Sequence, residues 1–285
     1  MASVPFDSRE GVIWYDGGFV DWKDAKVHVL THGLHYASAV FEGERAYGGE
    51  IFKLREHTER LIESGRILGF TIPYSADEID EACRETVRRA GLKDAYVRPI
   101  AWRGSEMMGV SAQHNTIHLA IAAWAWPSYF SPEERLKGIR LDIAEYRRPD
   151  PRTAPCRSKA AGLYMICTIS KHAAEAKGYA DAMMFDYRGY VAEATGANVF
   201  FVKDGALHTP TPDCFLNGIT RQTVIELARR QGVEVIERHI RPEERSTFSE
   251  CVICGTAAEV TPVSEIGPHR FTPGAISEAL MNAYT

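Results

Sequence analysis

The sequence has little of what marks secreted, membrane-spanning or disulfide-bonded proteins. Its six cysteines are dispersed through 285 residues, too few for a disulfide framework, so we expect reduced thiols. No stretch approaches the roughly 20 consecutive apolar residues that cross a bilayer. Residues 1–9 lack the charged-then-apolar layout of a signal peptide. We therefore expect a cytoplasmic protein with no membrane partner.

An excess of positive charge is also lacking. Lysine and arginine number 33 against 38 acidic residues, and the basic residues are scattered, which argues against nucleic acid as a partner. The sequence contains no G-x-G-x-x-G, G-x-x-x-x-G-K-[ST], G-x-S-x-G or H-E-x-x-H motif. Dinucleotide-binding, P-loop, serine-hydrolase and zincin chemistry therefore have no support in the sequence.

The length of the chain favours two lobes. A chain of 285 residues is long for one simple core, which leaves room for a cleft between lobes. The turn-rich segment Trp126-Pro-Ser-Tyr-Phe-Ser-Pro132 separates apolar, strand-like runs at residues 117–124 and 139–143 and is the predicted linker. We place the boundary at about residue 130, which gives a small α/β domain over residues 1–130 and a larger domain over residues 131–285.

Local patterns predict a mixture of strands and helices in both lobes. Turn residues between apolar runs predict hairpins at residues 12–22, 46–53 and 198–208. Ser75 and Glu78 form a capping-box pattern at the start of a helix. Residues 162–177 predict a well-buried helix, and Gly218 precedes another amphipathic helix. The fold class is α/β (α+β).

Three local features fit chemistry when taken together, and each also has an ordinary structural interpretation. Lys159 stands before an apolar helix start, where an amine can form a Schiff base or simply face solvent. Glu193 lies among small residues that admit a planar ligand or form a plain turn. Ile219-Thr220 opens a helix whose N–H groups suit a phosphate or water.

Metal binding is not expected. Cys251 and Cys254 form a lone C-x-x-C pair in an apolar run and lack the second ligand pair of a closed zinc site. A non-catalytic scaffold stabilised by zinc at this pair stays open as an alternative of a different class. It would make Lys159 a surface residue.

Considered together, several segments resemble the fold-type IV pyridoxal-phosphate enzymes, and specifically the bacterial branched-chain aminotransferases. The resemblance covers nearly the whole chain. The segments that carry it are His35-Tyr36, Val40-Phe-Glu-Gly43, Arg55-Glu-His-Thr-Glu-Arg-Leu61, Tyr96-Val-Arg-Pro99, Ser158-Lys-Ala160, Gly218-Ile-Thr-Arg221 and Gly255-Thr-Ala-Ala-Glu259. Their order and spacing imply pyridoxal 5'-phosphate as the cofactor, bound between the lobes.

The resemblance assigns roles to cofactor-binding residues. Lys159 would hold the cofactor as a Schiff base and then move the substrate proton. Glu193 would pair with the pyridine nitrogen and keep it protonated. Tyr164 would bind the ring 3-oxygen. The phosphate would be held by Arg60, the N–H of Ile219, Thr220 and Thr256.

Substrate-binding residues and assembly are also implied by the resemblance. The α-carboxylate would meet the N–H groups of Thr256 and Ala257, assisted by Tyr96. The side-chain pocket would comprise Arg98 and Tyr36 for a γ-carboxylate, and Phe41, Trp126 and Tyr129 for apolar side chains. Branched-chain L-amino acids (leucine, isoleucine, valine) and glutamate would share this site, and a homodimer or larger even assembly would complete it.

Two departures from the family pattern affect the expected substrate range. Met107-Met108 stands where branched-chain members usually have Gly-Met, and Arg157 precedes Ser158 and Lys159. The open alternatives within the same fold are a D-amino-acid aminotransferase, an (R)-amine aminotransferase and an aminodeoxychorismate-lyase-like enzyme. The Tyr96-x-Arg98 and Gly255-Thr-Ala-Ala258 segments favour the branched-chain member.

Overall fold

The computed structural model describes residues 4–126 and 136–284, and these form two compact units. The first contains residues 4–126 together with Ser158–Gly162, and the second contains residues 136–157 and 163–284. The boundary expected at about residue 130 and most of the expected linker lie outside the described residues. The sequence-based division assigned Ser158–Gly162 to the larger domain. They group instead with the first unit, because Ala160 bridges to Val40 and Ser158 bonds to Ser64.

The first unit is built on one antiparallel sheet. Its strands are β1 (Val12–Tyr15), β2 (Gly18–Asp21), β3 (Ala39–Phe41), β4 (Glu44–Tyr47), β5 (Glu50–Ile51), β6 (Ala95–Arg103) and β7 (Ile117–Ala125). They follow the order β2-β1-β7-β6-β4-β5, with β3 also paired to β6. The hairpins predicted at residues 12–22 and 46–53 are confirmed as β1–β2 and β4–β5.

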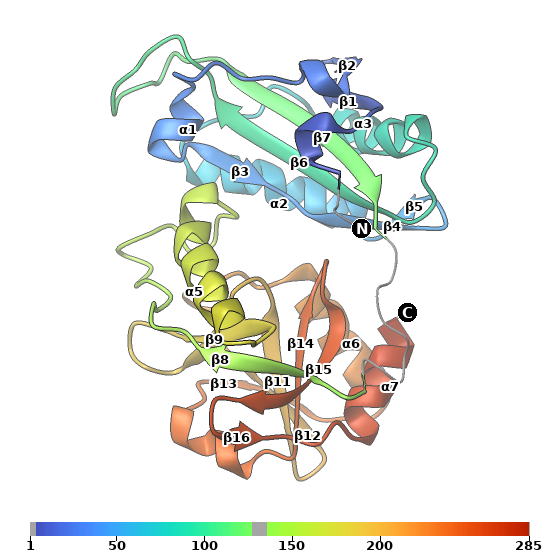
Figure 1. Cartoon of the computed structure of the whole chain (residues 1–285), viewed down its shortest axis with the longest axis vertical. Coiled ribbons are helices and arrows are strands. Elements are labelled where there is room, and N and C mark those ends of the chain that lie inside the picture. Colours follow the sequence, from blue (N-terminus) through green and yellow to red (C-terminus); the bar gives the residue numbers. More distant parts are fainter. Residues whose placement is uncertain (1–3, 127–135, 285) are drawn as a thin grey trace. The chain divides into compact units, whose positions relative to one another are not determined.

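Two helices cover one face of this sheet. They are α2 (Leu54–Ile67) and α3 (Ala76–Arg89), and their buried faces pack with alternate strand residues in one apolar cluster (Figure 1). The capping box predicted at Ser75 and Glu78 is confirmed at the start of α3. The other face carries η1 (Phe6–Ser8), η2 (Trp22–Asp24) and α1 (His32–Tyr36), and it has a smaller apolar cluster around Trp22 and Trp102.

The second unit is built on a sheet that closes on itself. Its strands are β8 (Ile139–Ile143), β9 (Asp181–Phe185), β10 (Val191–Ala194), β11 (Asn198–Lys203), β12 (Ala206–Pro210), β13 (Val235–Arg238), β14 (Glu250–Gly255), β15 (Glu259–Ile266) and β16 (His269–Arg270). These strands follow the order β10-β9-β8-β15-β14-β11-β12-β13, and β10 also pairs with β11. Six strands therefore form a ring, and the pair Glu193↔Asn198 closes it. The hairpin predicted at residues 198–208 is confirmed as β11–β12.

Helices pack on the outside of this ring. They are α5 (Met165–Ala176), preceded by η3 (Ala161–Tyr164), then α6 (Ile219–Arg230) and α7 (Ala275–Tyr284), while η4 (Pro242–Thr247) is a short 3-10 turn. Both α6 and α7 lie beside β14, and α7 also packs on β15 (Figure 1). The prediction that residues 162–177 form a well-buried helix is wrong in part. Met165 and Ile169 are exposed, because only one face of α5 packs on the sheet. None of the described helices is long and apolar enough to cross a bilayer.

Candidate active site

The backbone of Lys159 is fixed within the first unit. Its N–H donates to Ser64 Oγ at 3.0 Å, and its carbonyl accepts from the N–H of Phe41 at 3.1 Å. The neighbouring Ser158 hydroxyl donates to the Ser64 carbonyl at 3.0 Å. The lysine therefore precedes η3 as a short extended segment bonded to α2 and β3, not as the first residue of a helix. Its amine lies 5.2 Å from the centre of the Phe41 ring.

Arg60 extends from α2 and is paired with a buried carboxylate. Its Nε and Nη2 donate to the two oxygens of Glu42 at 2.6 and 2.8 Å. His57 Nδ1 lies 2.7 Å from Glu42 Oε2, and both Glu42 and His57 are buried. Burial alone would raise the pKa of Glu42, but the charge of Arg60 and the contact with His57 outweigh it and hold that pKa well below its usual range. Glu42 is therefore a carboxylate that orients Arg60.

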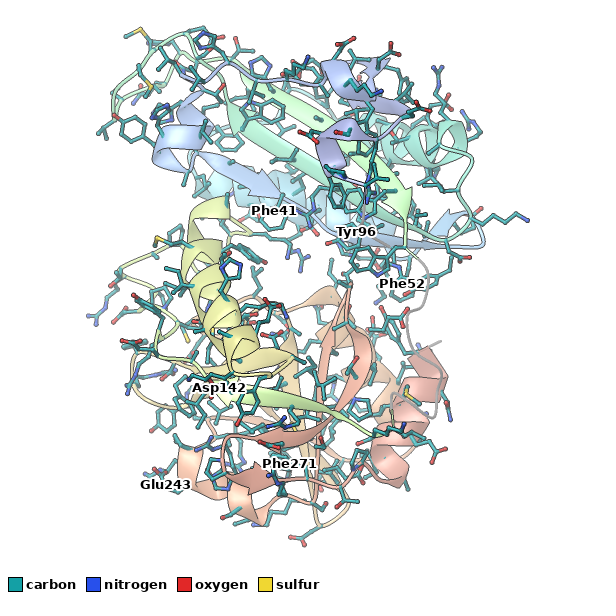
Figure 2. The ribbon with its side chains drawn as sticks, in the orientation of Figure 1. Phe41, Phe52, Tyr96, Asp142, Glu243 and Phe271 are labelled. Carbon is teal, nitrogen blue, oxygen red and sulfur yellow. The ribbon has the colours of Figure 1, made fainter. Side chains whose placement is uncertain are left out.

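Aromatic rings surround Arg98 on β6. Its Cζ lies 4.7 Å from the ring centre of Phe41 and 5.2 Å from that of Tyr96, both labelled in Figure 2. Its Nη2 donates to the Tyr96 hydroxyl at 3.1 Å. Trp124 and Trp126 pack on Tyr96, with ring centres 5.0 and 5.2 Å away. The first unit thus brings a guanidinium and a phenol together on a largely aromatic surface.

Gly43 makes room for this arrangement. A side chain at this position would collide with the Tyr96 hydroxyl, so the Tyr96 ring lies directly against the Gly43 backbone. The structure therefore brings together Phe41, Tyr96, Arg98 and Trp126, four of the residues that the sequence resemblance assigned to the substrate. Tyr36 is a separate case, because it is 45% exposed on α1 and stacks on His32. Tyr129 lies outside the described residues.

Glu193 lies on β10 in the second unit, where it is buried between two polar partners. Its Oε1 lies 3.2 Å from Arg148 Nε, and its Oε2 accepts from Asn198 Nδ2 at 3.1 Å. Burial alone would lower the pKa of Arg148, but the charge of Glu193, together with the Cys167 thiol, Tyr164 and the Cys156 thiol, outweighs this effect and raises that pKa. Arg148, Glu193 and Tyr164 therefore form one electrostatic cluster in which the Glu193 carboxyl group is paired with a buried guanidinium.

The remaining predicted residues of the second unit gather at the same end of its sheet. Gly218 is the N-cap of α6 and no side chain of the described residues caps this helix, so its first N–H groups are available for an anion. Thr256 and Ala257 form the turn between β14 and β15. Gly255 lies against the backbone of Gly196 and Ala197 in the turn between β10 and β11. In addition, Asn198 at the start of β11 is opposite both Glu193 and Cys254.

Comparisons with known proteins identify the chain. The family model described as amino-transferase class IV matches residues 39–266. A branched-chain-amino-acid aminotransferase from Pseudomonas aeruginosa is 43% identical over 283 residues, covering 97% of this chain and 92% of that protein. A crystal structure of the T.th. branched-chain amino acid aminotransferase with pyridoxamine 5'-phosphate has a TM-score of 0.94 at 38% identity, covering 97% and 93% of the two chains. The chain belongs to the class IV aminotransferases.

A second solved structure gives the same result. It is the T.th. branched-chain amino acid aminotransferase complexed with N-(5'-phosphopyridoxyl)-L-glutamate, with a TM-score of 0.92 at 37% identity and coverage of 97% and 93%. The resemblance to branched-chain members of the class IV aminotransferases, and the fold type IV that it implies, are thereby confirmed. The Pseudomonas aeruginosa and T.th. relatives both carry the branched-chain name, which favours that activity over the other members of the fold.

The zinc-stabilised alternative fails on strand geometry. Cys251 and Cys254 are three residues apart in β14, so their side chains point to opposite faces of the sheet. Cys251 packs in the cluster inside the ring, whereas Cys254 packs in the cluster facing α6 and α7. Burial raises the pKa of both thiols. These two residues of the class IV aminotransferase are therefore core side chains that cannot share one metal ion.

Four residues in the contacts around the predicted site residues received no role from the sequence: Glu42, His57, Arg148 and Asn198. Glu42 and His57 lie within segments that carry the family resemblance, whereas Arg148 and Asn198 lie outside those segments. Arg148 was the hardest to find. The pair Arg147-Arg148 before a proline is typical of a solvent-exposed turn, but Arg148 is only 4% exposed. Of the two family departures, Met107 and Met108 are exposed in the first unit, and Arg157 is exposed beside buried Ser158.

Proposed function

We propose that this aminotransferase uses pyridoxal 5'-phosphate to exchange amino groups between branched-chain L-amino acids (leucine, isoleucine, valine) and 2-oxoglutarate. The products are the branched 2-oxo acids and glutamate. The observation that carries the proposal is Arg98, a guanidinium held between the rings of Phe41 and Tyr96. Such a surface accepts an aliphatic side chain on its rings and a second carboxylate on its cation, which this reaction requires.

The chemistry of the polar groups fits the cofactor. When bound, pyridoxal phosphate supplies an aldehyde that condenses with amines and a ring that accepts electrons. The chain offers an amine at Lys159, a guanidinium with one buried counter-ion at Arg60 and a buried carboxylate at Glu193. An uncapped helix start at α6 adds N–H donors for a phosphate.

Each of these groups has a separate task in the proposal. Lys159 anchors the cofactor and afterwards carries the proton that leaves the substrate α-carbon. Glu193 holds a proton on the ring nitrogen, and its ion pair with Arg148 supports this role because it orients the carboxyl group. Tyr164, next to Arg148 in the same cluster, donates to the ring 3-oxygen.

The phosphate is assigned to groups that carry either charge or free N–H donors. Arg60 supplies the charge, and its orientation is set by Glu42. The N–H of Ile219, together with Thr220 and Thr256, supplies hydrogen bonds. The N–H groups of Thr256 and Ala257, in the turn between β14 and β15, receive the substrate α-carboxylate with help from Tyr96.

For the substrate side chain, Phe41, Trp126 and Tyr129 form the apolar part of the proposed pocket, and Arg98 with Tyr36 takes a γ-carboxylate. The solved complex of the T.th. enzyme with a phosphopyridoxyl-glutamate supports glutamate as one of the two substrates. The contacts of Trp126 with Tyr96 and of Phe41 with Arg98 support the apolar assignment.

We also propose a homodimer, or a larger even assembly, in the cytoplasm, without nucleic-acid or membrane partners. The first unit exposes a set of large apolar side chains that water would otherwise solvate: Val27, Val29, Leu30, Leu34, Tyr36, Met107, Met108 and Val110. Surfaces of this kind mark contacts with a partner chain. The six cysteines are free and buried, which is consistent with a reducing compartment.

The visible absorbance spectrum of the purified protein tests the function. We expect a cofactor band that is bleached by L-leucine and by L-glutamate, added separately. Bleaching only by D-alanine or only by (R)-1-phenylethylamine would replace the substrate assignment by another member of the same fold. Lys159→Ala should abolish turnover and leave the protein folded, whereas an active variant would remove Lys159 from the proposed site.

A further inference from the structure

Asn198 occupies a junction in the second unit that the proposed function leaves without a role. It begins β11, is 6% exposed and lies opposite Glu193 in the pair that closes the ring of strands. Its Nδ2 donates to Glu193 Oε2 and to the carbonyl of Leu216, both at 3.1 Å. Its Oδ1 accepts from the N–H of Gly218 at 3.2 Å. One side chain therefore connects the Glu193 carboxylate to the residues that precede α6.

The surroundings allow only one orientation of this amide. Reversing it would place Nδ2 against the Gly218 N–H donor, and Oδ1 against the Glu193 carboxylate and the Leu216 carbonyl. All three hydrogen bonds would become repulsive contacts. The side chain is thus a fixed spacer with a donor end facing Glu193 and an acceptor end facing the start of α6.

The absence of a side chain at Gly218 allows Asn198 to lie close to the backbone at the start of α6. Its φ of -59° and ψ of 142° are open to any residue, so backbone conformation does not require glycine there. A side chain at Gly218 would collide with Asn198 Oδ1. The glycine is therefore needed for the approach of Asn198 to the N-cap of α6.

We propose that Asn198 is a positioning residue that fixes the distance between the Glu193 carboxylate and the first N–H groups of α6. This inference rests on the proposed function, in which Glu193 serves the ring nitrogen while Ile219 and Thr220 serve the phosphate. Because the cofactor is a rigid molecule, both of its ends bind at full strength only when these two anchors keep a matched separation.

The test compares the affinities of the full-length protein, freed of cofactor, for pyridoxal phosphate and for pyridoxal, which lacks the phosphate. The readout is the ratio of the two dissociation constants, measured from the visible band. Asn198→Ala should reduce the advantage of the phosphate by about tenfold, since that is the effect of losing about 1.4 kcal/mol. Pyridoxal touches only one of the two anchors, so its own affinity should change much less.

A second variant and a control keep the test decisive. Asn198→Asp preserves the shape and the acceptor for the Gly218 N–H, but it turns a carboxylate oxygen toward Glu193, so repulsion should lower the ratio as well. Asn217→Ala is the matched control. Asn217 is an exposed amide of the same loop that accepts from Arg221 Nη1 at 2.8 Å. Its removal should leave the ratio at the wild-type value.

The possible results separate the inference from the function on which it rests. If the ratio of dissociation constants is unchanged in both Asn198 variants, the positioning role is overturned and the proposed function is left intact. An equal loss of affinity for both ligands also leaves the ratio unchanged and has the same meaning. If the wild-type protein forms no cofactor band, or binds pyridoxal as tightly as pyridoxal phosphate, the proposed function itself is wrong. A lowered ratio in both Asn198 variants with a normal Asn217→Ala supports the inference.

Discussion

Replacing Glu44 by glutamine is expected to weaken the pH dependence of stability of this aminotransferase. Glu44 begins β4 and is completely buried. Its carboxyl oxygens have no hydrogen-bond partner among the described residues other than the weakly polar thiol of Cys83. Burial, with the nearby charges of Glu42 and Asp80, raises the pKa of Glu44 well above its usual value. At pH values between the unfolded-state pKa and this raised pKa, the folded protein therefore holds the Glu44 carboxyl group protonated.

The sign and size of the effect follow from linkage. A carboxyl group with a raised folded-state pKa contributes its full stability below the unfolded pKa of about 4.3. That contribution is lost as the pH rises through the folded-state pKa. Between the two values, the free energy of unfolding falls by about 1.4 kcal/mol per pH unit because the unfolded chain releases a proton that the folded chain keeps. Glutamine cannot ionise, so the Glu44→Gln variant lacks this slope.

Urea unfolding at a series of pH values that rises from about pH 5 measures this slope. The difference in unfolding free energy, variant minus wild type, should increase by about 1.4 kcal/mol for each pH unit. A constant offset from burying the amide does not affect the slope. Glu59→Gln, at an exposed position on the neighbouring helix α2, is the control and should follow the wild type. Parallel curves for Glu44→Gln and wild type would refute the reasoning.

Three further variants test the site. Gly43→Ala forces a methyl group against the Tyr96 hydroxyl, so KM for amino acids should rise about tenfold while the cofactor band is retained. Gly18→Ala is the control, because its methyl group meets no atom within 4 Å and should leave KM unchanged. Glu193→Gln should bind cofactor but react with L-leucine at least about a hundredfold more slowly; an unchanged single-turnover rate would remove it from the mechanism. Arg60→Ala should weaken pyridoxal phosphate by about tenfold and leave pyridoxal unaffected, and equal weakening of both would contradict a phosphate role.

Much of the local structure could be predicted because its causes are local. Glycine and aspartate between short apolar runs determine the hairpin at β1–β2, and the reciprocal bonds of Ser75 and Glu78 determine the start of α3. The helix α5 was harder, since its composition is apolar around much of its circumference. Only the packing of one face on the sheet shows that Met165 and Ile169 remain exposed.

The candidate site divides in the same way. The order and spacing of motifs singled out Lys159, Glu193, Arg98 and Thr256, since these residues lie in short segments whose pattern is readable along the chain. The partners of these residues were not readable. Arg148 is far from Glu193 in sequence, whereas Asn198 is close to it. Neither distance along the chain predicts these contacts, because they depend on the pairing of strands that closes the ring.

The sequence by itself determined the family and the cofactor, and it suggested the residues that carry the chemistry, because reactive groups of this kind have to stand in particular short segments. Tertiary structure decided the charge state and orientation of those groups. Glu42 is an anion because Arg60 and His57 meet it in the core, and Glu193 is oriented by the buried arginine beside it. It also decided that Cys251 and Cys254 are core residues, since a strand turns side chains three apart to opposite faces.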